Sequence, residues 1–274
     1  MRHASRRSEV KREIEHKVAV RAKQRIDSEA DSRLDRTAQR LRAEMLQPLE
    51  NLALKPEMLS AETTDERMVM QLRLATERQL SAHTHRPWAP SDSLFSLQIH
   101  QTAINNILNR LKLDGVTITL GELRSRVTEQ LNLHLSLADD AQYDDVEITF
   151  AKRDAVHVDC RDGRIAITLS IEKLKSSRQV WRDFQVLAYY RVQVEGLSAE
   201  LVRDGSIRMI GRRVRASSQF ALRSIFGKVF SHNAARQMIP ERILNNENMS
   251  DQMVTQFKIE DGWVALAMGP KRQK

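Results

Sequence analysis

Asp-Gly pairs recur through the C-terminal two-thirds of this 274-residue chain, and three of them separate short runs of alternating apolar residues. These pairs are Asp162-Gly163, Asp204-Gly205 and Asp261-Gly262. Asp-Gly supplies the two positive-φ residues of a type I′ turn, whose twist matches that of the antiparallel strands on either side. The chain is therefore expected to form an antiparallel sheet built from hairpins, and each pair is predicted to join two neighbouring strands.

The first part of the chain has the periodicity of a helix. Between Ser8 and Leu46 small or apolar residues recur at steps of four, closed by one step of three, and no Gly or Pro interrupts them before Pro48. A narrow apolar stripe on a charged helix predicts one long helix that packs by a single side. We expect that side to make contact through its large apolar residues: Ile14, Ile26, Leu34, Leu41 and Met45.

The pattern divides the chain into four parts. Residues 1–80 are expected to hold the long helix and a hairpin, and residues 81–93 a linker or a strap over the surface. Residues 94–270 are expected to form a larger unit of mixed helices and strands, followed by a basic tail at 271–274. The predicted fold class is α+β, with a long N-terminal helix, a highly twisted antiparallel sheet and helices packed on that sheet.

The formal net charge of +8 is concentrated at the two ends of the chain. Cations exceed carboxylates by six within residues 1–25, and the last four residues add three more cations. This distribution predicts contact with an acidic surface such as anionic lipid, and it disfavours a uniformly basic nucleic-acid-binding domain. The low aromatic content of 5% also disfavours binding of single-stranded nucleic acid.

No run of 18 apolar residues occurs, so no transmembrane segment is predicted. No apolar stretch of signal-peptide length follows the basic N-terminus. Two locations stay open: the cytoplasm, or the cell envelope if the chain is part of a longer exported precursor.

Common enzyme motifs are missing from the sequence, including phosphate-binding glycine loops, the nucleophile elbow and paired His or Cys zinc motifs. We therefore expect a non-catalytic protein without cofactor or metal. Cys160 is expected to be a small buried hydrophobe, and His83, His85 and His100 are expected to be surface loop residues. The acidic segment 139–145 is expected to be a solvated connection, because it has no Gly for a calcium loop.

The densest internal set of arginines allows two interpretations. They form an anion- or lipid-headgroup-binding patch at a sheet edge, or they protect an edge strand against aggregation by their charge. The set consists of Arg203, Arg208, Arg212, Arg213 and Arg215.

Two apolar sets are candidates for the lining of an acyl-chain groove, since Met is adaptable and Phe offers a large apolar area. The first set is predicted on one strand face: Met68, Met70, Leu72 and Leu74. The second is predicted on one helix face: Phe220, Ile225, Phe226 and Phe230. Ordinary core packing explains the same residues equally well, and both interpretations stay open.

Residues 97–108 read as a strand that runs straight into a helix with the sequence Ala-Ile-Asn-Asn-Ile-Leu. This segment resembles the start of a tubular lipid-binding repeat, the fold of bactericidal permeability-increasing protein and its relatives. The resemblance covers a small part of the chain and implies a long helix along a strongly curved antiparallel sheet, with an apolar groove for acyl chains. The chain is also similar to the C-terminal regions of longer, uncharacterised bacterial proteins. No binding residue follows from either likeness.

Together these features predict a module of bacterial type that binds lipid or another hydrophobe, or that lies on a membrane surface. The alternative is a structural or assembly protein that engages a protein partner through its long charged helix.

Overall fold

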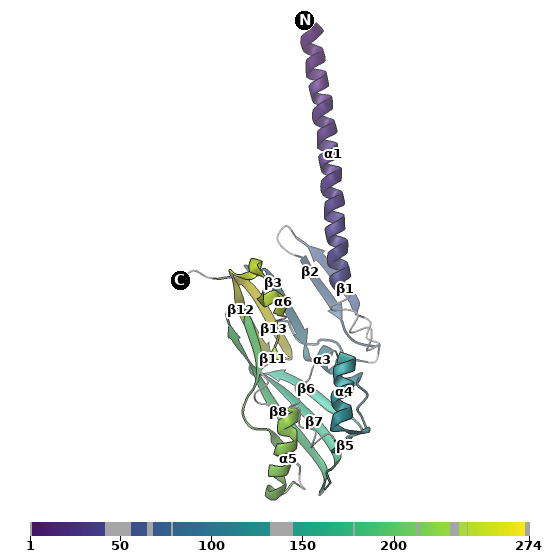
Figure 1. Cartoon of the computed structure of the whole chain (residues 1–274), viewed down its shortest axis with the longest axis vertical. Helices are drawn as coiled ribbons and strands as arrows, with labels where there is room; N and C mark the ends of the chain where they lie inside the picture. The colour runs from purple at the N-terminus through teal and green to yellow at the C-terminus, as the bar shows by residue number, and fades with distance from the viewer. Residues whose placement is uncertain are drawn as a thin grey trace. The chain divides into compact units, whose positions relative to one another are not determined.

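The computed structural model describes residues 2–41, 56–64, 68–77, 79–131, 145–177, 179–211, 214–230, 236–239 and 241–271. The chain divides into two compact units, Met1–Pro48 and Leu49–Lys274. The predicted α+β class is confirmed, because the chain has a long N-terminal helix and several antiparallel sheets with helices packed on them (Figure 1).

The described part of the first unit is a single helix, α1 (Arg2–Leu41), which begins earlier than the predicted Ser8. No Gly or Pro interrupts this segment, and an i,i+4 ion pair between Arg33 and Glu29 (2.9 Å) supports it. The side chains between residues 16 and 33 are exposed, including that of Ile26, which was predicted to pack. The predicted contacts of Ile14, Leu34, Leu41 and Met45 lie outside the described side chains.

The second unit begins with an antiparallel hairpin, β1 (Glu57–Thr63) and β2 (Met68–Arg73), as the alternating pattern predicted. An irregular segment then leads to strand β3 (Phe95–His100) and helix α3 (Gln101–Asn109).

A large antiparallel sheet forms the body of this unit. Its strand order is β11-β9-β8-β7-β5-β4, with β6 also paired to β7 and β10 also paired to β8. The strands are β4 (Thr117–Thr119), β5 (Glu147–Phe150), β6 (Val156–Arg161), β7 (Arg164–Lys175), β8 (Val180–Glu195), β9 (Ser198–Arg203), β10 (Arg208–Ile210) and β11 (Arg236–Gln237).

Helices α4 (Leu120–Leu131) and α5 (Ala216–Val229) add apolar side chains to the core of this sheet. The ring of Phe226 on α5 meets Phe184 of β8 edge to face, with centroids 6.3 Å apart. Cys160 is fully buried in the same core, as predicted.

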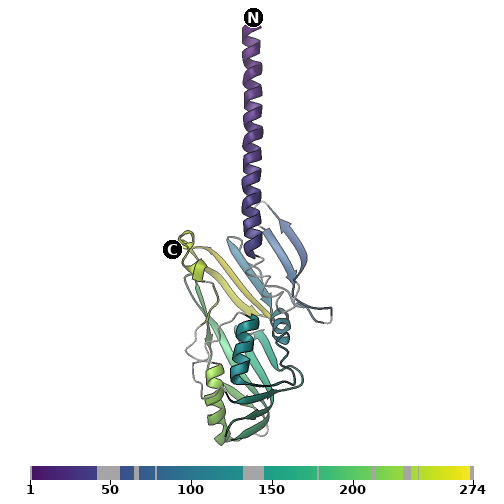
Figure 2. The same ribbon diagram turned by 45° about the vertical axis from the view of Figure 1, so that its right-hand side comes forward.

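A smaller sheet has the order β12-β13-β3, with β12 (Gln252–Glu260) and β13 (Trp263–Pro270) (Figure 2). Helix α6 (Glu241–Leu244) and the 3-10 helix η3 (Glu247–Met249) precede it. Main-chain hydrogen bonds tie both ends of β12 to turns of the large sheet, from Gly163 N to Ile259 O (3.0 Å) and from Val254 N to Gly196 O (2.8 Å). The other edge of this sheet, β3, pairs only with β13 among the described residues.

Two of the three predicted Asp-Gly hairpins are confirmed. Asp162-Gly163 joins β6 to β7 and Asp261-Gly262 joins β12 to β13, and all four residues have positive φ. The third prediction, at Asp204-Gly205, is wrong.

Strands β9 and β10 on either side of Asp204-Gly205 both pair with β8, and not with each other. Arg203 lies opposite Tyr190 and Arg208 lies opposite Leu187, so four residues bulge out where β8 has two. Gly205, at φ +78°, permits this bulge. The real turn into β9 is at Gly196, where Glu195 pairs with Ser198.

Candidate functional site

Exposed apolar side chains gather in one part of the described chain. Of the 19 large hydrophobic residues that are exposed, 11 fall between Met58 and Ile99. They are Met58, Leu59, Met68, Met70, Leu72, Leu80, Trp88, Leu94, Phe95, Leu97 and Ile99. Isolated exposed hydrophobes are ordinary, but such a concentration makes this stretch the candidate for a contact surface.

Strand β3 carries the most regular part of this surface. Phe95, Leu97 and Ile99 alternate along one face and are 36–47% exposed. They lie directly opposite Met268, Leu266 and Val264 of β13, which belong to the two apolar cores. One apolar sheet face is therefore covered at β13 and open at β3.

The opposite face of the same sheet is closed by residues 81–93, which run across it as a strap. Trp263 Nε1 donates to Thr84 O (3.3 Å), and Gln256 Nε2 donates to Trp88 O (2.9 Å). The alanines of β13 are almost fully buried. The open part of the apolar face of the small sheet is therefore its β3 edge, with Phe95, Leu97 and Ile99.

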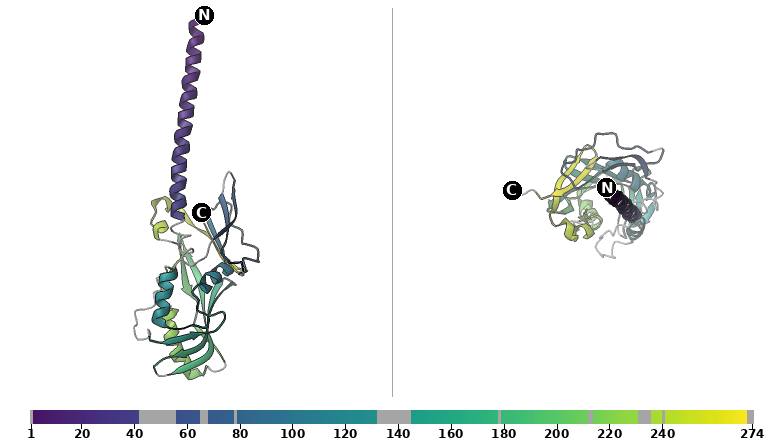
Figure 3. Two further views of the ribbon diagram at one scale, coloured as in Figure 1. Left: turned by 90° about the vertical axis from the view of Figure 1, so that its right-hand side faces the viewer. Right: turned by 90° about the horizontal axis from the view of Figure 1, so that it is seen from above.

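The hairpin bears a second apolar face. Met68, Met70 and Leu72 alternate on β2, and Leu72 lies opposite Met58 of β1. All four side chains are exposed. Both apolar faces lie at the same end of the second unit, and α5 lies at its other end (Figure 3).

The predicted acyl-chain groove is not assembled from its eight residues. Met68, Met70 and Leu72 are exposed on β2 and Leu74 follows them, whereas Ile225, Phe226 and Phe230 are buried in the main core. Phe220 is 79% exposed. The reason is the helical repeat, since the buried side of α5 passes through Leu222, Ile225 and Phe226, and Phe220 is on the other side.

The predicted arginine patch is also divided. Arg203 is half-buried, and its Nη1 donates to Phe230 O (2.6 Å) at the C-terminal end of α5, where a cation complements the helix dipole. Arg208 on β10 and Arg215 at the N-cap of α5 are exposed. Arg212 and Arg213 lie outside the described residues. Arg203 therefore has a structural role at the end of α5.

His100 departs from the prediction that it is a surface loop residue, because it is 3% exposed at the end of β3. Its Nδ1 accepts from Thr102 N (3.2 Å) and caps α3, and its Nε2 lies 3.2 Å from Thr84 Oγ1. The Thr84 hydroxyl donates to Asp261 O (2.6 Å), so Nε2 must carry the ring hydrogen. Burial, and to a smaller extent His83, lower the pKa of His100 below its ordinary value of 6.5.

The surroundings of His100 explain its burial. Its ring meets those of His83 and Trp263 edge to face, at centroid distances of 5.2 and 5.0 Å. A Cβ atom at Gly262 would lie 2.6 Å from His100 Nε2, so the turn of the last hairpin closes directly over the imidazole. The neutral ring joins the strap, helix α3 and the last hairpin.

Polar side chains of α3 form a second joint, which the sequence analysis missed. Asn105 Nδ2 donates to Val158 O and its Oδ1 accepts from Val158 N, both at 2.8 Å. Gln101 Oε1 accepts from Cys160 N (2.7 Å). These amides bond the edge of β6 as a further strand would. The buried Asn106 holds the chain after the hairpin, donating to Leu74 O (2.9 Å) and Leu80 O (3.1 Å).

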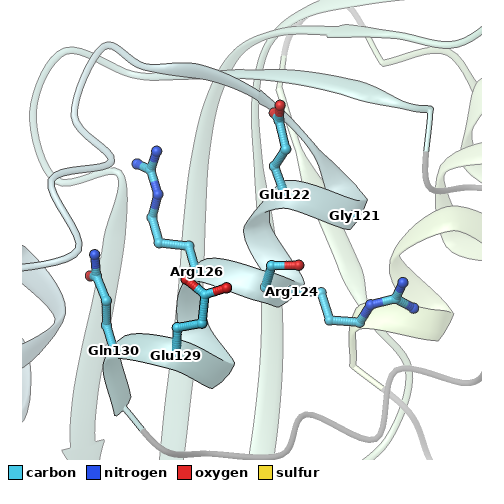
Figure 4. A pocket seen from close by; sticks show the side chains of 7 residues that line it. Gly121, Glu122, Arg124, Arg126, Glu129 and Gln130 are labelled. Carbon is cyan, nitrogen blue, oxygen red and sulfur yellow. The ribbon is translucent and has the colours of Figure 1, made fainter.

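Three hollows on the described surface are open to solvent. One is lined by a single helix, α4, where Arg124 and Arg126 point away from each other (Figure 4). Glu122 in that hollow is engaged in a capping box, accepting from Thr119 N (2.8 Å). Another hollow, of about 350 Å³, lies between β8 and β12 and is lined partly by Val192, Val194 and Phe257.

Burial and the nearby Asp159 raise the pKa of the Cys160 thiol to about 12, so it is a poor nucleophile. Within the described ranges, no group of three or more His, Cys, Asp or Glu side chains could hold a metal ion. The helices of the described part are not long and apolar enough to cross a membrane.

No protein-family model matches the chain, and no curated protein matches it.

Proposed function

We propose that this chain is a non-catalytic module that binds lipid or another hydrophobe on the open apolar faces of β2 and β3. The observation that carries the proposal is the concentration of exposed apolar side chains between Met58 and Ile99. Covering about 200 Å² of such surface is worth roughly 5 kcal/mol at about 25 cal/mol per Å². A hydrophobic ligand would gain this energy without displacing any part of the folded core.

Two features favour a flexible hydrophobe as the ligand. The exposed face of β2 contains two methionines, whose side chains adapt to ligands of irregular shape. Strand β3 has no Lys, Arg, Asp or Glu, so its face offers little to a charged partner.

A fluorescence titration with cis-parinaric acid, a natural fatty-acid probe, tests the proposal on the purified full chain. Replacing Met70 and Leu97 together by Gln should weaken binding of the probe at least about tenfold, equivalent to about 1.4 kcal/mol. Both side chains are exposed, so the thermal unfolding midpoint should hardly change. The matched control is Val180→Gln, which replaces an exposed apolar residue of β8.

The proposal fails if the wild-type chain neither binds the probe nor carries extractable lipid from its host. It also fails if the double variant binds as well as Val180→Gln does. Loss of binding in Val192→Gln instead would move the site to the hollow between β8 and β12.

The second candidate function is assembly with a protein partner through α1. It is favoured by the exposed apolar residues of that helix, Val18, Val20 and Ile26. Sedimentation equilibrium of the full chain, compared with a Val18→Gln, Ile26→Gln variant, tests self-association. A chain that is empty of lipid and forms oligomers only when these residues are present would support assembly over hydrophobe binding.

A further inference from the structure

The second unit contains a long basic segment that is not evident from the net charge of the whole chain. Residues 205–239 include seven cations and no carboxylate. The cations are Arg208, Arg212, Arg213, Arg215, Arg223, Lys228 and Arg236. Acidic residues in other parts of the second unit balance these seven cations, so the net charge of the middle of the chain is small although this segment is strongly basic.

Helix α5 lies within this segment and exposes one aromatic residue. Phe220 is 79% exposed, whereas Leu222 and Phe226 are completely buried. The positions that share the outer face with Phe220 at i+4 and i+7 are Ser224 and Gly227. Among the described side chains of α5, Phe220 is the one large apolar residue that is exposed.

Cations flank the exposed ring. Arg215 at the N-cap, five residues before Phe220, and Arg223, three residues after it, are both exposed, and the guanidinium of Arg223 bonds only weakly to Gln219 on the same helix (3.4 Å). The carboxylate that directly precedes the segment, Asp204, lies 3.6 Å from Arg164.

The β10 side of the segment has a different character. Ile210 is exposed there, but it borders a hollow that is also lined by Glu172 and Asp183. Two carboxylates beside an apolar residue do not favour an anionic partner. The basic and apolar surface is therefore the outer face of α5, at the opposite end of the unit from the hairpin (Figure 3).

We propose that the outer face of α5 docks on an anionic lipid bilayer, with Phe220 entering the headgroup region and Arg215 and Arg223 contacting lipid phosphates. An exposed aromatic ring beside cations is the combination that interfacial helices use. Each Lys or Arg near an anionic membrane contributes about 1 kcal/mol, which salt weakens. Nucleic acid fits less well, because one ring is no stacking platform for successive bases.

This surface shares no residue with the hydrophobe-binding faces of β2 and β3, so each proposal stands or fails separately. The first test is sedimentation of the full chain with vesicles of phosphatidylcholine alone or mixed with phosphatidylglycerol. The basic N-terminal helix would also attract anionic vesicles, so binding of the wild-type chain alone does not test the proposal. The test is the difference in binding between variants of α5 and their controls.

Phe220→Ser and the Arg215→Gln, Arg223→Gln variant should each reduce the fraction bound to the mixed vesicles at least about fivefold. The matched controls are Val180→Ser and Arg191→Gln, an exposed apolar residue and an exposed arginine of β8. Met70→Gln, Leu97→Gln should bind vesicles like the wild type. Equal binding by the Phe220→Ser variant and its control overturns the proposal, even if the chain binds vesicles strongly.

A fluorescent label locates the contact. The single native thiol, Cys160, is buried and its pKa is raised to about 12, so a thiol-reactive fluorophore will label Ser224→Cys at position 224 alone, on the same helix face as the retained Phe220. Its emission should rise on addition of mixed vesicles and should not rise for a label at Gln193→Cys, an exposed position of β8. An unchanged emission at position 224 overturns the proposal.

Discussion

Replacing Asn105 by Ala should be among the most damaging single changes at the surface of the large sheet. The Asn105 amide bonds both the N–H and the C=O of Val158 at 2.8 Å, on the edge of β6 that faces α3. Val158 is buried, so loss of the amide leaves two main-chain groups without their partner. Each unsatisfied group costs about 1–3 kcal/mol, and we expect the free energy of unfolding to fall by roughly 2–4 kcal/mol.

Urea unfolding followed by circular dichroism measures this change as a lower midpoint at an unchanged slope. The matched control is Asn109→Ala, which replaces an exposed Asn at the end of the same helix and should change the free energy by less than about 0.5 kcal/mol. Equal stabilities of the two variants would show that α3 does not secure the edge of β6.

Two further predictions concern the joint at His100. The pKa of His100 is lowered in the folded chain, so on acidification the unfolded chain takes up the proton first. The free energy of unfolding should therefore fall below about pH 6.5 and level off once the folded ring is also protonated. Urea unfolding from pH 7.5 to 5 measures this fall, which the His100→Gln variant should lack. Gly262→Ala should destabilise the chain more than Gly163→Ala, although both glycines have positive φ, because a Cβ meets His100 Nε2 only at Gly262; equal unfolding midpoints would contradict this.

The sequence predicted local features of the fold better than pairings between strands. Asp162-Gly163 and Asp261-Gly262 were correctly identified as hairpin turns, because the strands on either side of each pair are long enough to bond one another. At Asp204-Gly205 the same dipeptide accommodates a bulge. The difference lies in β8, a strand of 16 residues that pairs with both flanking segments, and no local pattern reveals such a partner.

The prediction that Phe220 shares a helix face with Phe226 could have been rejected from the spacing of these residues alone. Phe220 and Phe226 are six positions apart, and at 3.6 residues per turn this spacing places them on well-separated sides of a helix. The buried positions 222, 225 and 226 follow the i, i+3, i+4 rule that Phe220 breaks. The exposure of Phe220 was therefore predictable, whereas the burial of Phe230 against the core depended on the tertiary fold.

The polar residues of α3 show why a likeness in residues 97–108 says little about a ligand. Gln101 and Asn105 bond main-chain groups of β6, and Asn106 bonds carbonyls that follow the hairpin. Their partners lie 26 to 59 residues away, so the sequence could not identify them. Because these amides are engaged with the backbone, they fix the architecture and have little capacity left for a bound molecule. The two surfaces proposed for recognition consist instead of exposed side chains, which are the open apolar residues of β2 and β3 and Phe220 of α5.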